Sequence, residues 1–443
     1  EVEPSIYKVN TNSTSEIVSY FRTADLSSGG FVSTWEDGQN IYYQKYNDLG
    51  VATSSKIAVS NDFDTHVPNV VELSNGNIVV AWQSYDYSAG YRHTAYKIFD
   101  DSNNPIASGI ASQNSNDDYV TTEIVDLKNG SFLLSNVVID NFPGMSPHAV
   151  GFRVYDYAGN PTGNEFFYDF PTNNGQRSTD IISLDNDKVG MILFTEGKLQ
   201  SYILDTTSKN GIITDLYSFN NLNDYPGFQL TQSKNGFYTA FNENDNYYIA
   251  EIASDGAIIQ QPSLIMNGNY SRMDIVEFGD NYILAAYSDN SNEITYGILL
   301  DQSDLSIVTS PKKIFDGALN VDSNININES GDIIISGTNQ NNGVLELHHI
   351  RDESFNPIIL DKDDLALKQE HYGGNGNDKM DGGDLLSDLK LYGGKGSDEL
   401  FGGKGHDKID GGDDDDKLKG GEGHDYILGG KGSDTLELEA DGI

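Results

Sequence analysis

The stretch GGNGNDKMD, from Gly373 to Asp381, decides the fold of the C-terminal part of this chain, because near-copies of it follow almost without a break. Each regular copy starts with two glycines, has an aspartate in sixth place and has an apolar residue in eighth place. The regular copies are GGNGNDKMD (Gly373 to Asp381), GGKGSDELF (Gly393 to Phe401), GGKGHDKID (Gly402 to Asp410), GGDDDDKLK (Gly411 to Lys419), GGEGHDYIL (Gly420 to Leu428) and GGKGSDTLE (Gly429 to Glu437). A tandem period of this kind indicates repeated turns that stack on one another.

The conserved places in the unit have a physical logic. Glycine lets the backbone turn tightly with positive φ. Residues six and eight lie on the same side of an extended segment, so the aspartate can face a cation at the turn while the apolar residue packs inward. Stacked turns then form a column of carboxylates and carbonyls, which suits a hard cation with about six to eight oxygen ligands. The candidate metal-binding residues are Gly374, Gly376, Asp378, Gly394, Gly396, Asp398, Gly403, Gly405, Asp407, Gly412, Asp414, Asp416, Gly421, Gly423, Asp425, Gly430, Gly432 and Asp434.

This segment resembles the calcium-binding RTX nonapeptide repeat, GGxGxDxUx. The resemblance implies a right-handed parallel β-roll with calcium held in its turns, and secretion, usually by a type I exporter. Two departures stand out. The longer unit GGDLLSDLKLY (Gly382 to Tyr392) puts Asp388 out of register, and Asp414 replaces a glycine, which predicts either strain or an extra ligand. A Gly/Asp-rich linker is the alternative, but it would not keep an apolar residue in every eighth place.

The composition of the chain limits the classes of molecule that we expect it to bind. The chain has 443 residues and a net charge of −41, from 68 acidic against 27 basic residues. Such a field repels nucleic acid and anionic membranes and favours cations. There is no cysteine, and no apolar run approaches the ~18 residues of a membrane span. We therefore expect no nucleic-acid partner and no membrane insertion.

The two ends of the chain bear on export. The N-terminus, EVEPSIYKVN, shows no signal peptide, because no basic segment is followed by an apolar one. Exported RTX proteins usually carry a further signal beyond the last repeat, whereas this chain ends at Ile443. We therefore expect a fragment or a processed form.

The first 365 residues repeat a looser pattern of four strands. Asn75-Gly76, Asn129-Gly130 and Asn235-Gly236 are strong hairpin signals. The second and third strands of the seven units are Gly30 to Trp35 with Ile41 to Tyr46, Asn77 to Trp82 with His93 to Phe99, Ser131 to Ile139 with Ala149 to Tyr155, Val189 to Phe194 with Leu199 to Leu204, Phe237 to Phe241 with Tyr247 to Ile252, Tyr282 to Tyr287 with Ile294 to Leu300, and Ile333 to Gly337 with Val344 to Ile350. Four short strands in every ~50 residues favour a β-propeller over an array of β-sandwiches.

We therefore predict an all-β chain, with a seven-bladed β-propeller in residues 1–365 followed by a calcium-binding parallel β-roll in residues 366–443. Ser5 to Asn10 could pair into the seventh blade and close the ring, and Phe355 to Asp361 competes for that place. No convincing amphipathic helix is visible.

Motifs for catalysis are missing from the sequence. No HExxH, GxSxG or phosphate-loop motif occurs, and His406 and His424 fall in the variable fifth place of the repeat, where we expect them to face solvent. Acidic stretches such as Asp62-Phe63-Asp64 lack the full spacing of a calcium loop, and whether they bind calcium stays open. Tyr85, Tyr87 and Tyr91, expected in one loop, suit a sugar surface, although ordinary loop packing is favoured.

Three functions follow from this pattern. The favoured one is a secreted calcium-binding protein of the bacterial surface or extracellular matrix, whose propeller binds a glycan or a cell-surface protein as an adhesin does. The second is a structural subunit that assembles with itself into a calcium-dependent surface layer or filament. The third is an extracellular enzyme that cleaves polysaccharides or phosphoesters. The lack of a recognisable acid–base set favours binding or assembly over catalysis.

Overall fold

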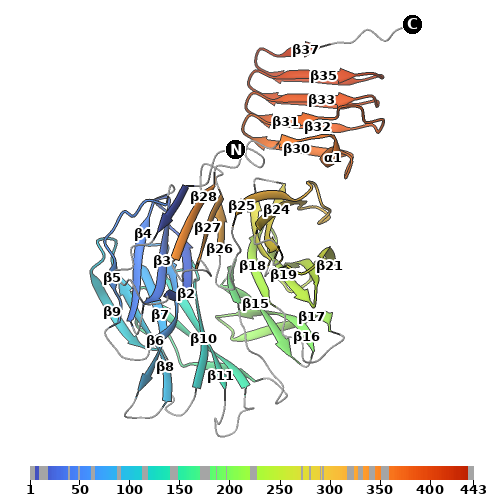
Figure 1. Cartoon of the computed structure of the whole chain (residues 1–443). Coiled ribbons are helices and arrows are strands. Elements are labelled where there is room, and N and C mark those ends of the chain that lie inside the picture. Colours follow the sequence, from blue (N-terminus) through green and yellow to red (C-terminus); the bar gives the residue numbers. More distant parts are fainter. Residues whose placement is uncertain are drawn as a thin grey trace.

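A computed structural model describes residues 5–8, 18–37, 40–47, 50–60, 65–86, 91–111, 118–139, 148–169, 180–185, 187–195, 197–219, 227–270, 273–278, 281–289, 291, 294–316, 324–327, 333–338, 345–350 and 359–437. These residues form antiparallel sheets arranged as a ring, followed by a stack of parallel strands (Figure 1). The prediction of an all-β chain with a propeller and a C-terminal roll is confirmed.

Among the described strands, six sheets are each built from four consecutive antiparallel strands. Their bounds are β2 (Val18–Asp25), β3 (Phe31–Asp37), β4 (Asn40–Tyr46) and β5 (Ile57–Ala58); β6 (Thr65–Glu72), β7 (Ile78–Asp86), β8 (Tyr91–Phe99) and β9 (Pro105–Ile110); β10 (Asp118–Asp126), β11 (Ser131–Ile139), β12 (His148–Asp156) and β13 (Phe166–Asp169); β14 (Asp180–Leu184), β15 (Lys188–Thr195), β16 (Lys198–Asp205) and β17 (Asn210–Ser218); β18 (Phe228–Ser233), β19 (Gly236–Glu243), β20 (Asn246–Ala253) and β21 (Ile258–Asn267); and β22 (Asp274–Phe278), β23 (Tyr282–Asp289), β24 (Ile294–Asp301) and β25 (Lys312–Asp316).

The strands of the seventh predicted unit form a sheet that uses both ends of the propeller sequence. In this sheet β26 (Asn324–Ile327), β27 (Ile333–Thr338) and β28 (Leu345–Ile350) are joined by β1 (Ser5–Lys8). β1 lies antiparallel to β28, with Ser5 opposite His349. The sequence predicted seven blades, the last of which the N-terminal strand could complete. Among the described residues, the structure has six sheets of consecutive strands and this composite sheet, whose outer strand is that N-terminal one.

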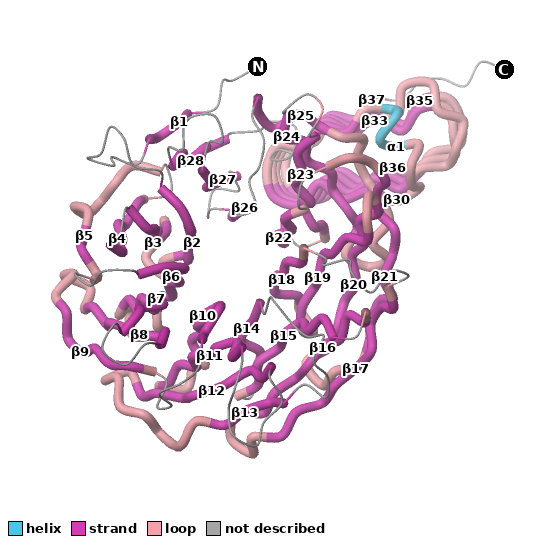
Figure 2. Tube along the Cα trace, turned by 60° about the horizontal axis from the view of Figure 1, so that its bottom comes forward, coloured by secondary structure: helices cyan, strands magenta, loops and turns pink. Residues whose placement is uncertain are grey.

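The propeller core lies between neighbouring sheets, and Figure 2 shows the sheets following one another around the ring. Adjacent residues of one strand pack against different neighbouring sheets. In β7, Val80 packs in the cluster shared with β3 and β4, whereas Val79 packs in the cluster shared with β10 and β11. Because side chains alternate across a strand, a strand covered on both faces must be apolar throughout. This explains the continuous apolar runs in the second strand of each unit.

The C-terminal part consists of two parallel sheets whose strands alternate along the chain. One sheet has the order β29-β31-β33-β35-β37 and the other has the order β30-β32-β34-β36. The bounds are β29 (Ile359–Leu360), α1 (Lys362–Leu365), β30 (Glu370–Asn375), β31 (Lys379–Asp381), β32 (Lys390–Lys395), β33 (Glu399–Gly403), β34 (Lys408–Asp413), β35 (Lys417–Gly421), β36 (Tyr426–Lys431) and β37 (Thr435–Glu437). The apolar eighth-place residues Met380, Leu400 and Leu418 are buried between the sheets, as predicted.

The segment just before the repeats differs from expectation. Ile359 and Leu360, which competed as the ring-closing strand, pair in parallel with Lys379 and Met380 and belong to the roll. The short helix α1 follows, and its N-cap Asp361 forms a capping box with Asp364. A capping box has a sequence signature of an acidic or hydroxyl residue three places before another polar acceptor. The sequence DKDD carries it, although no helix was predicted.

Candidate calcium sites in the roll

The sixth-place aspartates form two columns, one on each edge of the roll. The first column contains Asp378, Asp398, Asp416 and Asp434, each joined to the next by one hydrogen bond. The backbone N–H of Asp378 donates to Oδ1 of Asp398 at 2.7 Å, and that of Asp398 donates to Oδ1 of Asp416 at 2.8 Å. The N–H of Asp416 donates to Oδ1 of Asp434 at 3.1 Å. One carboxylate oxygen of Asp398, Asp416 and Asp434 therefore holds the preceding turn in the stack.

The second column is shorter, because the long unit has Leu389, its eighth residue, at the place in the stack that a sixth-place aspartate fills in the regular units. The backbone N–H of Leu389 donates to Oδ1 of Asp407 at 2.8 Å, and that of Asp407 donates to Oδ1 of Asp425 at 2.9 Å. Leu389 is buried and supplies no carboxylate. The sequence placed Asp388 out of register, and the structure agrees, because Asp388 occupies the fifth position of its turn.

The second carboxylate oxygen is what makes these columns candidate cation sites. Oδ2 of Asp398, Asp407 and Asp416 is buried and has no hydrogen-bond partner among the described residues. A buried carboxylate oxygen without a donor or a cation is costly. The donor set fits calcium, which prefers carboxylate and carbonyl oxygens.

The first glycine of each unit is required by this buried oxygen. A Cβ atom on Gly393 would lie 2.1 Å from Oδ2 of Asp398, and one on Gly411 would lie 2.2 Å from Oδ2 of Asp416. Any side chain there would displace the carboxylate. The unit thus keeps an open cradle at each aspartate.

Burial changes the acidity of these aspartates. It raises the pKa of Asp398 to about 7, with the charges of Asp378 and Asp416 adding to the effect. Burial also raises the pKa of Asp407 to about 6 and shifts the pKa of Asp416 upward. Without a cation the charged form is disfavoured, and a bound divalent cation would reverse this by attraction.

The predicted glycines take the turn conformations that the repeat implies. Positive φ occurs at Gly374, Gly376, Gly394, Gly396, Gly403, Gly412, Gly421, Gly423, Gly430 and Gly432, while Gly405 is not among them. Asp414 has φ +78°, so a non-glycine residue takes the left-handed conformation and the predicted strain is present. As ligands, these glycines and all of the predicted aspartates, Asp398, Asp407, Asp414 and Asp416 included, stay predictions.

A second ladder, in the fifth position, was missed by the sequence reasoning. Side-chain atoms there accept the backbone N–H of the next turn on the same edge. Asn377 accepts from Ser397 at 2.9 Å, Asp388 from His406 at 2.8 Å, and Nδ1 of His406 from His424 at 2.8 Å. The rings of His406 and His424 stack with their centroids 5.3 Å apart. Asn, Asp and His at this place share an acceptor two bonds from Cβ, which is the signal that could have found it.

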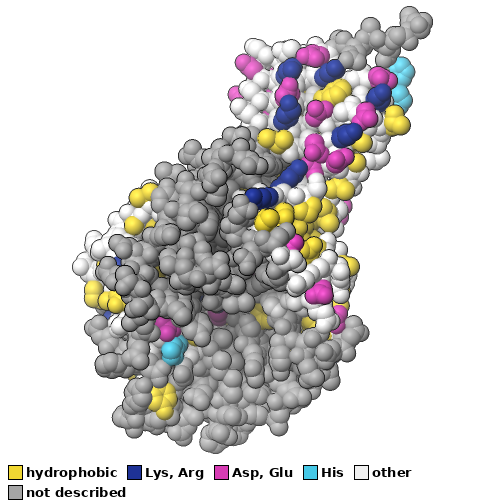
Figure 3. Space-filling model, in the orientation of Figure 1, with side chains coloured by type: hydrophobic (Ala, Val, Ile, Leu, Met, Phe, Trp, Pro, Cys, Tyr) yellow, Lys and Arg dark blue, Asp and Glu magenta, His cyan; other side chains and the backbone are white. Residues whose placement is uncertain are grey.

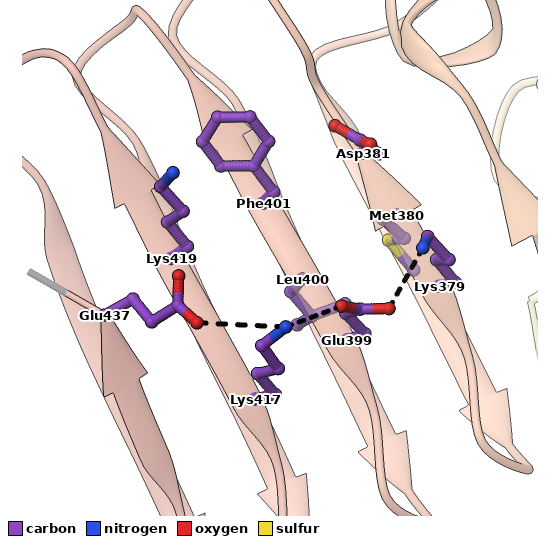
Figure 4. Close-up of a pocket in the computed structure, with 9 residues that line it drawn as sticks. All are labelled: Lys379, Met380, Asp381, Glu399, Leu400, Phe401, Lys417, Lys419 and Glu437. Carbon is purple, nitrogen blue, oxygen red and sulfur yellow. Dashed lines mark hydrogen bonds and ion pairs between the residues drawn. The ribbon is translucent and has the colours of Figure 1, made fainter.

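The outer face of one roll sheet carries alternating charges around a shallow pocket (Figure 4). Nζ of Lys379 lies 3.0 Å from Glu399, which also pairs with Lys417 at 2.9 Å. Lys417 reaches Glu437 at 3.8 Å. Figure 3 shows Lys and acidic side chains interspersed on the roll surface. This face keeps the strands in register by pairs that are each worth roughly 0–1 kcal/mol, and it lies apart from the aspartate columns.

The other candidate sites fall partly outside the described residues. Asp62 to Asp64 and Tyr87 lie outside them. Tyr85 belongs to β7 and Tyr91 to β8, where they sit on opposite sides of a hairpin, so the expected single aromatic loop is wrong. Within the described part of the chain, no helix is long and apolar enough to cross a membrane.

Comparison with known proteins identifies the repeats. Residues 390–418 and 401–436 match the RTX calcium-binding nonapeptide repeat (4 copies). The chain therefore contains calcium-binding RTX repeats, as the sequence predicted. No curated protein matches the chain.

Solved structures resemble the propeller only distantly. An α-L-arabinofuranosidase from Fusarium graminearum is 10% identical with a TM-score of 0.44, and the match covers 76% of this chain and 94% of that one. The NanB sialidase from Streptococcus pneumoniae is 11% identical with a TM-score of 0.42, covering 78% and 68%. A protein of unknown function from Dyadobacter fermentans is 9% identical with a TM-score of 0.46, covering 65% and 94%. Likeness at this level carries no argument about function.

Proposed function

We propose that this chain is a secreted calcium-binding protein of the bacterial surface or extracellular matrix, in which calcium folds the roll and the propeller binds a ligand. The buried, unpartnered Oδ2 atoms of Asp398, Asp407 and Asp416 carry the proposal. In their charged form they need a cation, and the RTX repeats that contain them bind calcium. RTX repeat proteins are typically secreted by the type I route, which supports an extracellular location.

The proposed calcium response follows from the carboxylate columns. Oδ1 of each aspartate holds the neighbouring turn, so Oδ2 and the turn carbonyls are left to hold the ion. When calcium is scarce, the buried carboxylates repel one another and the turns come apart. Extracellular calcium sites have dissociation constants of about 10⁻⁴–10⁻³ M, so calcium outside a cell fills them. The free energy of binding then becomes free energy of folding.

For the propeller we propose adhesion or ligand binding on a seven-bladed ring. Six sheets of consecutive strands support this, together with the composite sheet of β26, β27, β28 and β1, which would be the seventh blade. In Figure 2 the roll lies beside β22 to β25 and does not cross the middle of the ring. The folded roll itself therefore does not cover the middle of the ring in this view. We place the domain boundary before Ile359, where the first roll strand begins.

The full chain in millimolar calcium should be screened against arrays of glycans and bacterial surface proteins. Saturable binding by the full chain is the expected result, with heat-unfolded protein as the control. Negative-stain electron microscopy with and without calcium belongs beside this screen. Filaments or sheets that form only with calcium, with no saturable ligand, would contradict adhesion and indicate a structural subunit. Turnover of a polysaccharide or phosphoester library would indicate an enzyme instead.

A further inference from the structure

Two neighbouring propeller sheets and the roll share a single apolar core. The cluster joins buried side chains from β22 to β25 and the composite sheet with buried side chains from β29, α1 and the roll strands. Among its members are Tyr282, Leu284 and Leu299 on the propeller side, and Leu360 and Leu365 on the roll side. A shared core makes the orientation of the first roll turn depend on the propeller.

The hydroxyl of Tyr282 caps the first long strand of the roll. It accepts a hydrogen bond from the backbone N–H of Tyr372 and donates one to the carbonyl of Tyr372, both at 2.7 Å. Tyr372 lies in β30, the outermost strand of its sheet. An edge strand exposes unpaired N–H and C=O groups. The propeller satisfies both groups of Tyr372 with one buried side chain.

Asp364 fixes α1 to the same propeller sheet. Its carboxylate is fully buried and pairs with Nζ of Lys312 at 2.7 Å. The backbone N–H and the hydroxyl of Ser310 also donate to it, each at 2.7 Å. A buried charge needs this many donors to be tolerated.

Lys368 adds a third contact. Its Nζ lies 2.6 Å from Asp301 at the end of β24. Together with the contacts of Tyr282 and Asp364, it holds residues 359–375 against the propeller. None of the three contacts uses a sixth-place aspartate.

The eighth-place side chain at the C-terminal end of the roll is less buried than those near the propeller. The eighth-place residues Met380 and Leu418 are fully buried, whereas Leu436 in β37 is 46% exposed. In a repeat structure, each turn gains stability mainly from its neighbours, so a fixed first turn lowers the cost of adding the next. The first turn of the roll, residues 359–375, has such a fixed neighbour in the propeller.

We infer that the sheet β22 to β25 is a built-in cap for the roll, which holds residues 359–375 in strand and helix geometry without calcium, so that calcium orders the roll outward from the propeller. This inference rests on the calcium-dependent folding proposed above. It adds a direction to that folding and makes Tyr282 and Asp364 positioning residues for the calcium sites.

Hydrogen exchange on the full chain, read by mass spectrometry, tests the inference. In calcium-free protein, residues 359–375 should stay protected while residues 399–437 exchange freely, and millimolar calcium should protect both. In Y282F the buried N–H of Tyr372 loses its acceptor, so its exchange in calcium-free protein should be about tenfold faster. Y247F is the matched control, because the buried hydroxyl of Tyr247 donates at 2.6 Å to the carbonyl of Tyr270, within the propeller. It should leave residues 359–375 unchanged.

The outcomes separate the two proposals. If residues 359–375 exchange as fast as residues 399–437 in calcium-free protein, or if Y282F and Y247F behave alike there, the cap is refuted. If residues 399–437 are protected without calcium, the calcium-dependent folding itself is refuted. Trp35 and Trp82 lie buried in β3 and β7, so their fluorescence reports an intact propeller in every variant. Should Y282F lose that signal, D364N replaces it, with faster exchange of residues 359–368 expected.

Discussion

The propeller and the roll are both made of short strands, but they bury different chemistry. Between propeller sheets lie large side chains such as Trp35, Tyr43 and Phe237, which are fully buried. The roll interior has one apolar residue per turn, such as Leu400 and Ile409, and the buried aspartates lie next to these. Burying a large apolar side chain stabilises a fold by roughly 1.5–3 kcal/mol, whereas an unpaired buried charge costs more than that.

The difference teaches where each part finds its stability. The propeller can be stable on apolar packing alone, because each sheet is covered on both faces. The roll cannot, because every regular unit that adds one apolar residue also adds one buried or half-buried carboxylate, although the long unit places the apolar Leu389 there instead. A bound cation would neutralise these carboxylates and join neighbouring turns, so the carboxylates would then stabilise the roll. The two parts should therefore respond differently to calcium, pH and mutation.

Removing calcium should have the largest effect, and it should act on the roll and not on the propeller. We expect the far-ultraviolet circular dichroism signal of the roll strands beyond residue 375 to be lost with a chelator and restored by millimolar calcium. The fluorescence of Trp35 and Trp82 should not change, because both side chains lie in propeller cores. A roll that keeps its strand signal in chelator would remove the contrast between the two parts.

Lowering the pH of calcium-free protein should recover part of that loss. The pKa values of about 7 for Asp398 and about 6 for Asp407 lie above the ~3.9 of an unfolded aspartate. A raised folded-state pKa means that the folded roll binds more protons, so its stability falls as pH rises from about 4 to 7. Circular dichroism of calcium-free protein should show more roll strand at pH 5 than at pH 8. Equal signals, or a weaker one at pH 5, would contradict the burial of these carboxylates.

A single aspartate should matter less than the whole set of ions. Asp398→Asn keeps the acceptor for the N–H of Asp378 but removes the charge, and we expect calcium affinity to fall about tenfold or more, by roughly 1.4 kcal/mol per factor of ten. Asp410→Asn makes the same change in net charge outside the column and should leave the affinity nearly unchanged. Isothermal titration calorimetry measures both. Equal effects would mean that only overall charge attracts calcium.

The smallest effect is expected at Asp414. Its φ of +78° costs a non-glycine residue about 1–2 kcal/mol. In saturating calcium, Asp414→Gly should raise the free energy of unfolding of the roll, measured by thermal unfolding, by about 1 kcal/mol. Asp413→Gly is the matched control and should lower stability, because Asp413 is in strand β34 without positive φ. A loss of stability in Asp414→Gly would show that the Asp414 side chain binds the ion and that this outweighs the strain.

The sequence predicted the features of the fold that repeat along the chain. The nine-residue period placed an aspartate at each turn and an apolar residue inside, and it identified Asp388 as out of register. The hairpin signals and apolar runs likewise predicted the propeller strands and the closing strand at Ser5. These features depend on spacing along the chain, which a sequence shows directly.

Contacts between distant residues could not be predicted in this way. Tyr282 meets Tyr372, and Lys312 meets Asp364, through pairings that no repeat encodes. Ile359 and Leu360 form the first roll strand without the glycine signature, and they pair with Lys379 and Met380 of the next turn. The fifth-place ladder was overlooked because the residues that form it differ from unit to unit.

The pairing of β1 with β28 has a consequence for how fast the molecule forms. Ser5 and His349 stand at opposite ends of the propeller sequence, so the ring can be completed only after nearly all of it has been made. Folding slows as contacts become more distant in sequence. The last step to form should also be the first to come apart under load, since four residue pairs join the described parts of these strands. Tension applied to the N-terminus should therefore open the ring at this seam, beside the sheet that carries the roll.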